Sequence, residues 1–296
     1  NHIAGNCYDK INSKGVLVHL YGPHYMRFKK KKIFNYVSKF TKWIVGEYKV
    51  KSFVEGKLYP IPINLTTLEK FFKKKFRSKK EAVKFINKKK IKFKKVSNSE
   101  EYILSKLGKQ IYEKFYKNYT IKQWGIHPKN LDKSIVGRLP IRFNRNPYYV
   151  NQKIRVMPKN GYTSLFNNML KDKKINVNLK TDYKKIKNKV VPKIATIYTG
   201  PPDVFFDFKY GKLDWRSLNF KFRTVKKDKI QDCVQINFPN DHKYTRRVEI
   251  KHVTKQKTKF STLCLEYPQS KGDPYYPINN KKNKKTFSKY KKLIEQ

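Results

Sequence analysis

The side chains best suited to chemistry lie between positions 119 and 149, where arginines with aromatic neighbours interrupt a chain whose cations are mostly lysine. An arginine presents a rigid fork that can hold a phosphate through two hydrogen bonds, whereas a lysine presents a point charge. An aromatic ring beside such a fork can stack on a base. The pattern is therefore typical of a site for a nucleotide-like ligand, built from Tyr119, Trp124, Arg138, Arg142, Tyr148 and Tyr149.

A simpler interpretation of these residues is a buried helix-to-loop junction with arginines on its surface, and the stretch alone slightly favours it. The rest of the chain has no GxGxxG, GxxxxGK[ST], HExxH or GxSxG motif and no paired cysteines. Its six histidines are scattered, and no pair of carboxylates stands out. Arginines and aromatic rings without a nucleophile suggest a site whose chemistry belongs to a cofactor, and no metal is predicted.

The composition describes a folded chain with an unusual charge. The 296 residues are 38% hydrophobic and 15% aromatic, which is too apolar for a disordered polyelectrolyte. The formal net charge of +50 would attract any polyanion, nucleic acid included. The excess lysines are spread along the chain among many Asn, Ile, Tyr and Phe residues, a mixture that AT-rich coding also produces. We therefore favour compositional drift and expect nucleic acid to bind only by nonspecific charge.

The three cysteines form no CxxC pair, which fits a reducing compartment and predicts a cytoplasmic protein. No apolar run is long enough to span a membrane, and no signal peptide is recognisable. The chain starts at Asn1 in the middle of a motif, so we expect the natural protein to begin upstream.

The spacing of apolar residues predicts the elements that hold the site. The first half should contain a strand at 15–20, a helical face at 33–44 and a hairpin of 50–54 with 58–63, whose Pro60 and Pro62 indicate an edge strand. Helical spacing continues over 65–117 and places Phe115 and Tyr119 on adjacent turns. The second half should contain a helix capped by Thr163, strands at 175–179 and 194–198, an antiparallel sheet within 213–267 and a lysine-rich helical tail.

Eight short motifs, in this order and spacing, resemble the UDP-galactopyranose mutase family and together extend over nearly the whole chain. They are residues 1–9 (NHIAGNCYD), 18–24 (VHLYGPH), 58–64 (LYPIPIN), 119–125 (YTIKQWG), 138–143 (RLPIRF), 198–201 (YTGP), 244–246 (YTR) and 274–277 (PYYP). The resemblance implies an isomerase that interconverts UDP-galactopyranose and UDP-galactofuranose through a covalent adduct on reduced FAD, without net redox change. It also implies a homodimer formed through the helical part.

The resemblance assigns roles by position. Arg138 and Arg246 match the arginines that clamp the diphosphate, with Arg247 as an alternative in register. Tyr119 matches the ring that stacks on uracil, in a pocket shared with Phe115, Thr120 and Trp124. Tyr149 and Tyr276 match hydroxyls that touch the phosphates, with Tyr275 as the alternative to Tyr276. His24 matches a histidine against the flavin ring, and Gly5 and Asn6 lie where the family binds FAD.

The implied fold is α/β, with an incomplete Rossmann-like FAD-binding domain, a helical insert and an antiparallel sheet domain that binds the substrate. The corresponding ranges are 1–32 with 151–205 for the FAD-binding domain, 65–135 for the insert, 45–64, 136–150 and 206–280 for the sheet domain, and 281–296 for the tail.

Some features depart from the family. Ala4 replaces a usual glycine, Arg27 a second histidine of bacterial members, and Asn118 a usual glycine. The family's glycine-rich first strand would precede Asn1 and its last FAD-contacting segment would follow Gln296, so the resemblance implies a piece that is inactive alone. Alternatives are a degenerate family member, a polycationic nucleic-acid-binding protein on a flavoenzyme fold, and a different flavin oxidoreductase.

Overall fold

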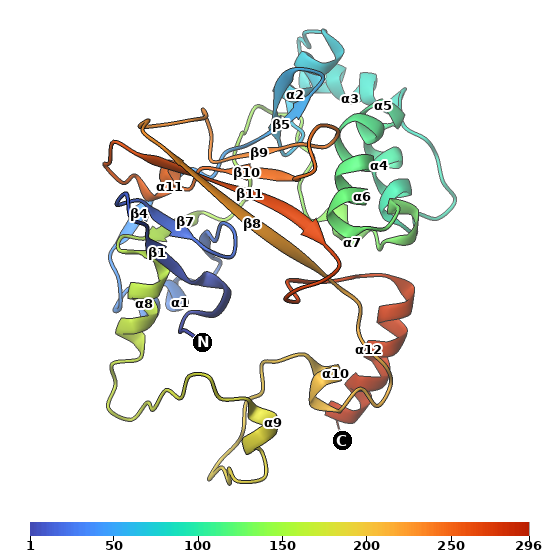
Figure 1. The fold of residues 1–296 in the computed structure, drawn as a ribbon. Helices are drawn as coiled ribbons and strands as arrows, with labels where there is room; N and C mark the ends of the chain where they lie inside the picture. The colour runs from blue at the N-terminus through green and yellow to red at the C-terminus, as the bar shows by residue number, and fades with distance from the viewer. Residues whose placement is uncertain (296) are drawn as a thin grey trace.

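A long, mostly antiparallel sheet forms the centre of the molecule. The computed structural model describes residues 1–295, and Figure 1 shows the sheet crossing the middle of the ribbon. Its strands lie in the order β12-β8-β11-β10-β9-β5-β6, and within the described residues only β5 and β9 run parallel. The strands are β5 (Val50–Val54), β6 (Lys57–Ile61), β8 (Trp215–Val225), β9 (Gln235–Asn237), β10 (Arg246–Val248), β11 (Ser261–Gln269) and β12 (Tyr276–Pro277).

The sheet confirms the local signals in the sequence. β5 and β6 form the expected hairpin, and β6 is an edge strand, as Pro60 and Pro62 indicated. The turn places Glu55 and Gly56 at φ values of 48° and 74°, the left-handed geometry of a two-residue hairpin loop. The antiparallel sheet predicted within 213–267 is also present, as β8 to β11.

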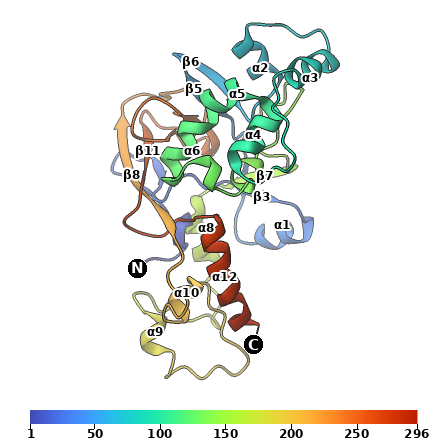
Figure 2. The ribbon, with the colours of Figure 1, turned by 90° about the vertical axis from the view of Figure 1, so that its right-hand side faces the viewer.

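Helices α2 to α7 lie together at one end of the sheet (Figures 1 and 2). They confirm the helical spacing predicted over 65–117, with non-helical breaks at 73–78 and 88–98, so that Phe76 lies outside α2. Three of them begin at a side chain that accepts the backbone N–H three residues later, namely Asn64, Ser78 and Asn98. Their apolar faces join one core that reaches the sheet. The helices are α2 (Leu65–Phe72), α3 (Lys79–Asn87), α4 (Ser99–Leu107), α5 (Lys109–Ile111), a π-helical segment (Tyr112–Lys117), α6 (Asn118–Trp124), a 3₁₀ turn (Pro128–Asn130) and α7 (Ser134–Gly137).

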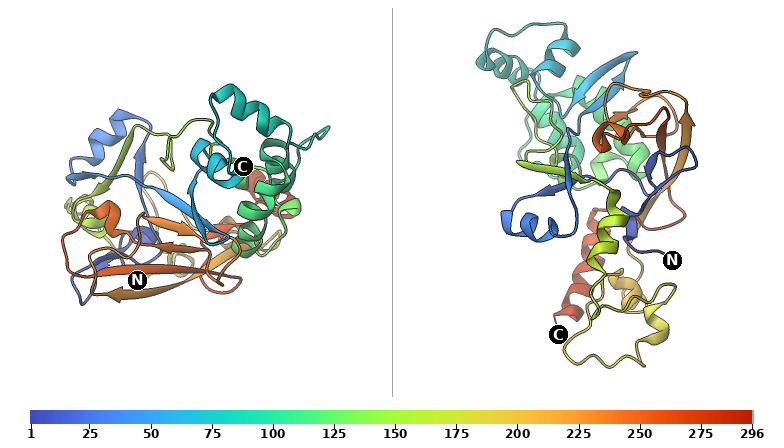
Figure 3. Two further views of the ribbon diagram at one scale, coloured as in Figure 1. Left: turned by 90° about the horizontal axis from the view of Figure 1, so that it is seen from above. Right: turned by 90° about the vertical axis from the view of Figure 1, so that its left-hand side faces the viewer.

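A second, smaller unit joins the start of the chain to residues 154–169, and Figure 3 shows its blue helix α1 on the side of the molecule opposite the helices α2 to α7. A 3₁₀ turn (Gly5–Cys7) leads into the hairpin of β1 (Asp9–Ile11) and β2 (Leu17–His19), which confirms the strand predicted at 15–20. A three-stranded sheet follows in the order β3-β7-β4. Its elements are β3 (Met26–Phe28), α1 (Lys31–Val37), β4 (Trp43–Val45), β7 (Ile154–Pro158) and α8 (Gly161–Met169).

The prediction of Thr163 as the cap of α8 is wrong, because a residue from the first hairpin takes that place. The Asp9 carboxylate accepts the N–H groups of Tyr162 and Thr163 at 2.6 and 2.8 Å. The Thr163 hydroxyl donates instead to the Asp9 carbonyl at 2.7 Å. A cap that arrives from 153 residues away leaves no signal in the local sequence.

The helical face predicted over 33–44 ends early, because the chain turns back to stack its aromatic rings. Helix α1 stops at Val37, and Ile44 lies in β4. The Ser38 hydroxyl donates to the Phe34 carbonyl and accepts the Trp43 indole N–H, both at 2.7 Å. Trp43 then stacks on Phe34 with the ring centroids 5.7 Å apart, which fixes the turn.

The strands predicted at 175–179 and 194–198 are wrong. Both segments are irregular, and no described strand pairs with them. Their apolar side chains are left in solvent, with Ile194 98% exposed, so the core that would have favoured a strand is missing. The connection carries α9 (Tyr183–Ile186) and reaches α10 (Pro202–Phe205).

The tail is the helix α12 (Lys281–Ile294), as predicted, and it lies beside α10 in Figures 1 and 2. The buried hydroxyl of Tyr290 accepts the Tyr210 N–H and donates to the Gly211 carbonyl, which ties the tail to the segment before β8. A further short helix, α11 (Lys251–Thr254), follows β10. Within residues 1–295, no helix combines the length and the apolar character that crossing a bilayer requires. The mixed α/β class with a helical part and an antiparallel sheet is thus confirmed, whereas the domain bounds stay a prediction.

Candidate active site

Two cavities that share one wall lie against the central sheet, the smaller one between the sheet and helices α6 and α7. Arg138 and Leu139 line both of them. The smaller cavity, of about 60 Å³, is mainly aromatic and aliphatic. The larger, of about 250 Å³, is lined by three arginines and by several tyrosines. An aromatic cavity that opens beside a cationic one matches the two halves of a nucleotide.

The smaller cavity collects the predicted base-binding residues from one continuous helical stretch. Phe115 lies in the π-helical segment and Tyr119, Thr120 and Trp124 in α6, and all four line the cavity. Because Phe115 and Tyr119 are four residues apart, they present their rings on the same face. The opposite wall comes from the sheet, through Ser52 of β5, Ile61 of β6 and Asn237 of β9.

Two amide side chains give this cavity hydrogen-bond donors. The Gln123 carbonyl oxygen accepts the Thr245 hydroxyl at 3.1 Å, and the Asn237 carbonyl oxygen accepts the Gln235 amide at 2.7 Å. With both oxygens occupied, the two NH₂ groups remain as donors, and neither has a partner among the described residues. A flat ring that carries carbonyl oxygens fits this arrangement.

Arg246 is the most firmly held cation of the larger cavity. Its Nε donates to the Tyr119 hydroxyl at 2.7 Å and its Nη1 to the Glu266 carboxylate at 3.1 Å. β10 and β11 place Arg246 directly opposite Glu266, whose side chain is 1% exposed against 12% for Arg246. Burial opposes the charge on Arg246, but Tyr119 and Glu266 raise its pKa above the usual value, so the guanidinium is charged.

Burial raises the pKa of Glu266, and the neighbouring Arg246 opposes that rise. We take the carboxylate to be ionised in this pair, because a guanidinium within hydrogen-bond distance favours the charged form. Arg246 therefore lines the larger cavity as one half of an ion pair, and its Nη2 bonds to no other described residue.

Arg138 differs from Arg246 in how it is held. It follows α7 directly, is exposed, and has no hydrogen bond to another described side chain. Together with Tyr149, Arg246 and Tyr276 it lines the larger cavity, so the structure brings these four predicted residues together. The described residues that line this cavity include Arg27 as a third cation and no carboxylate, a composition that favours an anionic ligand.

Two alternatives left open by the sequence point elsewhere. Neighbouring residues of a strand face opposite sides, so Arg247 lies away from the cavities and donates to Gln231 at 3.0 Å. Tyr275 likewise faces Tyr21 and Phe220, with ring centroids 6.2 and 5.6 Å apart, and lines neither cavity.

The residues predicted to bind the cofactor line neither cavity, although Pro23 and Tyr25 on either side of His24 line the larger one. Ala4 and Gly5 have positive φ values of 68° and 49°, and a Cβ added at Gly5 would meet no atom within 4 Å. The His24 Nδ1–H donates to the Gly22 carbonyl at 3.1 Å, and burial lowers the pKa of the ring, which is therefore neutral. The open, left-handed backbone turn at Ala4 and Gly5 fits the close approach of a large cofactor such as FAD.

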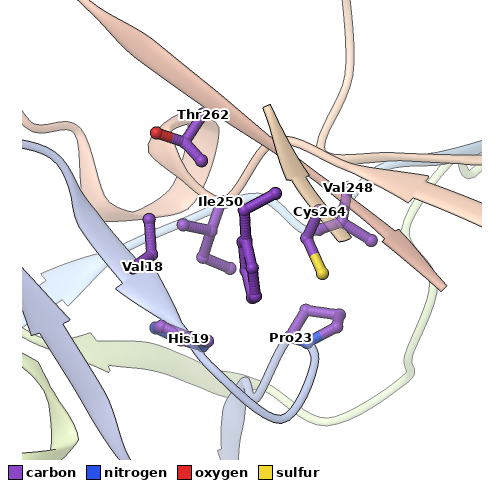
Figure 4. Close-up of a pocket in the computed structure, with 8 residues that line it drawn as sticks. Val18, His19, Pro23, Val248, Ile250, Thr262 and Cys264 are labelled. Atoms are coloured by element: carbon purple, nitrogen blue, oxygen red, sulfur yellow. The ribbon is translucent and has the colours of Figure 1, made fainter. Parts of the chain in front are cut away.

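A third cavity, drawn in Figure 4, lies between the first hairpin and the sheet. Its volume is about 10 Å³, roughly that of one water molecule, and its walls are mostly apolar. His19 lies on one side, and burial lowers the pKa of its ring to about 3. Pro23 lines both this cavity and the larger one, so the turn before His24 separates them. Among residues 1–295 no group of His, Cys, Asp and Glu could hold a metal ion.

Sequence reasoning missed several residues that shape the site. Glu266 pairs with Arg246 across strands, and Tyr48 donates to Gln235 at 2.8 Å in the wall of the larger cavity. A single carboxylate inside the apolar strand 261–267 was a usable signal for Glu266, because a buried charge requires a partner. Tyr48 and Gln235 had no such signal, since each is an ordinary residue of a strand or its flank.

Comparison with known proteins agrees with the motifs. A family model described as UDP-galactopyranose mutase matches residues 114–296. A Klebsiella pneumoniae protein named "Probable UDP-galactopyranose mutase" is 35% identical over 302 residues, which cover 100% of this chain and 78% of that protein. An Escherichia coli dTDP-fucopyranose mutase is 33% identical, covering 100% of this chain and 81% of the relative. A UDP-galactopyranose mutase of Mycoplasma genitalium is 29% identical, with 98% and 77% covered.

The fold agrees as well. A crystal structure of reduced UDP-galactopyranose mutase superposes with a TM-score of 0.64 at 14% identity, covering 93% of this chain and 68% of that one. At 14% identity the superposition shows a similar fold and nothing more. The family model, which spans more than half of the chain, and a relative 35% identical over its whole length show that the chain belongs to the UDP-galactopyranose mutase family.

Proposed function

We propose that this protein interconverts UDP-galactopyranose and UDP-galactofuranose. One observation carries the proposal: an aromatic cavity with amide donors and an arginine-lined cavity meet at Arg138. Uracil is a flat ring with two carbonyl oxygens, which suits the smaller cavity. The diphosphate and the sugar would then lie in the larger one, and Arg138 at the shared wall would meet the diphosphate between them.

The arginines have different tasks in this scheme. Arg246, oriented by Tyr119 and Glu266, would hold the diphosphate in a fixed direction. Arg138, which is exposed and bonds to no side chain in residues 1–295, would complete the clamp when the ligand arrives. When the bond between the anomeric carbon and the diphosphate breaks, its electron pair leaves with UDP, and the two guanidinium groups stabilise the growing negative charge.

The open, left-handed turn at Ala4 and Gly5 fits the close approach of FAD, and Asn6 and the neutral His24 are the further residues that would hold it. Reduced FAD, when bound, would supply the nucleophilic nitrogen for exchange at the anomeric carbon, because the described residues that line the larger cavity include no lysine, histidine or cysteine. The tyrosines of the larger cavity would hold the sugar and the phosphates in place, with Tyr149 and Tyr276 at the phosphates. The substrate and the product are isomers, so no net oxidation occurs.

The first test is binding of UDP to the chain by isothermal titration calorimetry, which requires no cofactor. Arg246→Ala and Arg138→Ala should each weaken UDP at least tenfold. Arg247→Ala is the matched control, because it removes the same charge one residue away on the opposite face of β10, and it should change affinity less than twofold. Equal losses in Arg246→Ala and Arg247→Ala would contradict the clamp.

The second test is turnover by the natural protein that contains this chain, because the resemblance implies that the chain alone is inactive. FAD and dithionite are added, UDP-galactofuranose is the substrate, and the products are separated by chromatography. UDP-galactopyranose should form and Arg138→Ala should abolish its formation. dTDP-fucopyranose is run in parallel, because a relative of 33% identity carries that name. Turnover of the dTDP sugar alone would replace our substrate. UDP binding without turnover of either sugar would favour a degenerate member of the family.

A further inference from the structure

Helix α6 holds the loop that leads into Arg246, in addition to lining the smaller cavity. This loop, residues 238–245, joins β9 to β10 and is largely exposed between residues 240 and 243. Four side chains of α6 reach the loop or the arginine after it. Asn118 donates to Asn240 at 3.0 Å, Tyr119 accepts from Arg246 at 2.7 Å, Gln123 accepts from Thr245 at 3.1 Å, and Lys122 donates to three carbonyls.

The helical repeat explains why these four residues act together. Positions 118, 119, 122 and 123 follow the i, i+1, i+4, i+5 spacing, so they form one face of α6. Tyr119 and Gln123 also line the smaller cavity, whereas Lys122 lines neither cavity. The hydrogen bonds of Lys122 therefore connect it to the ligand site through the loop.

Lys122 makes the largest number of these contacts. Its Nζ donates to the carbonyls of Phe238, Asp241 and His242 at 2.5, 3.1 and 3.1 Å. An ammonium group has three donors that can turn to meet three carbonyls, whereas a guanidinium presents its donors in one plane. The side chain is half-buried, so the contacts are partly shielded from water.

We propose that Lys122 is a positioning residue for Arg246: it fixes the 238–245 loop on α6, so that Arg246 meets the diphosphate already oriented. This inference rests on the proposed function. A loop that is ordered before binding loses less conformational freedom when the ligand arrives, which raises affinity without a new contact. The base-binding helix and the phosphate-binding arginine would thus form one rigid unit.

The test compares Lys122→Met with Lys117→Met by UDP titration. Both variants remove one lysine charge from the same helical stretch, but Lys117 makes no hydrogen bond to another described residue through its side chain. Lys122→Met should weaken UDP about tenfold or more, and Lys117→Met less than twofold. Asn240→Ala removes the hydrogen bonds of the same loop to Asn118 and to the Lys114 carbonyl, and it should also lower the affinity for UDP. This variant replaces Lys122→Met in the test if Lys122→Met folds poorly.

Coupling separates positioning from a general structural effect. In an Arg246→Lys background, Lys122→Met should change UDP affinity less than threefold, because the group that the loop orients has been replaced. Amide hydrogen exchange should show faster exchange confined to the 238–245 loop. Equal affinity loss in both backgrounds, or unchanged UDP affinity in Lys122→Met, would overturn the inference. Failure of the unmodified protein to bind UDP would instead remove the proposed function.

Discussion

Replacing Tyr119 by phenylalanine isolates the hydroxyl that orients Arg246. The ring that faces the smaller cavity stays, while Arg246 Nε loses an acceptor at 2.7 Å. The guanidinium side chain is 12% exposed, so water replaces that acceptor poorly, and Glu266 remains as its other partner. A hydrogen bond to a charged group contributes about 1.5–3 kcal/mol, which corresponds to a loss of UDP affinity of about 10- to 150-fold.

The assay compares UDP with uridine, because uridine carries the base but not the diphosphate. Tyr119→Phe should weaken UDP by the amount above and uridine less than twofold. Tyr116→Phe is the control, since Tyr116 lines the same cavity and its hydroxyl bonds to no other described residue. A parallel loss for uridine and UDP would show that the hydroxyl serves the base, and an unchanged UDP affinity would refute its role in orienting Arg246.

Three further predictions concern stability, measured as the free energy of unfolding in urea. Asp9→Ala removes the cap of α8 and should cost about 1–2 kcal/mol. Gly108→Ala should cost about 2 kcal/mol or more, because the φ of Gly108 is 81° and a Cβ would lie 2.2 Å from the Lys89 carbonyl oxygen. Gly56→Ala is the control and should cost less, because Gly56 has a φ of 74° but an added Cβ would meet no atom within 4 Å. Burial opposes the charge on Glu249, but hydrogen bonds from His252, Ser261 and two backbone amides outweigh burial and lower the pKa of this carboxyl. Glu249→Gln should therefore cost about 2–3 kcal/mol at pH values above the ordinary pKa of 4.5. This cost should shrink as the pH falls through the lowered pKa. A Glu249→Gln difference that stays constant down to low pH would contradict that assignment.

The sequence predicted best where the signal is local. The hairpin at Glu55-Gly56 and the helices from α2 to α6 follow from turn chemistry and helical spacing within a few residues. The aromatic wall of the smaller cavity could be predicted for the same reason, because Phe115, Tyr119 and Trp124 lie on one helical stretch.

Contacts between distant residues were not predictable from the sequence. Glu266 meets Arg246 through strand pairing, and Asp9 caps a helix 153 residues later. The strands expected at 175–179 failed for a related reason: their β-branched residues have a suitable local pattern, but no described strand lies beside them. A strand depends on its neighbour, whereas a short helix can be recognised from its own residues.

The capping of α8 by Asp9 also has a consequence for synthesis of the chain. The first hairpin and β3 find their partners, α8 and β7, only after residues 154–169 have been made. At a synthesis rate of about 5–20 residues per second, the first 28 residues wait on the order of 10 seconds for those partners. During that interval β3 is an unpaired edge and Val16 and Val18, buried in the folded protein, are in water. Until residues 154–169 have been made, residues 9–28 therefore offer an open strand edge and apolar side chains of the kind that a ribosome-associated chaperone would bind.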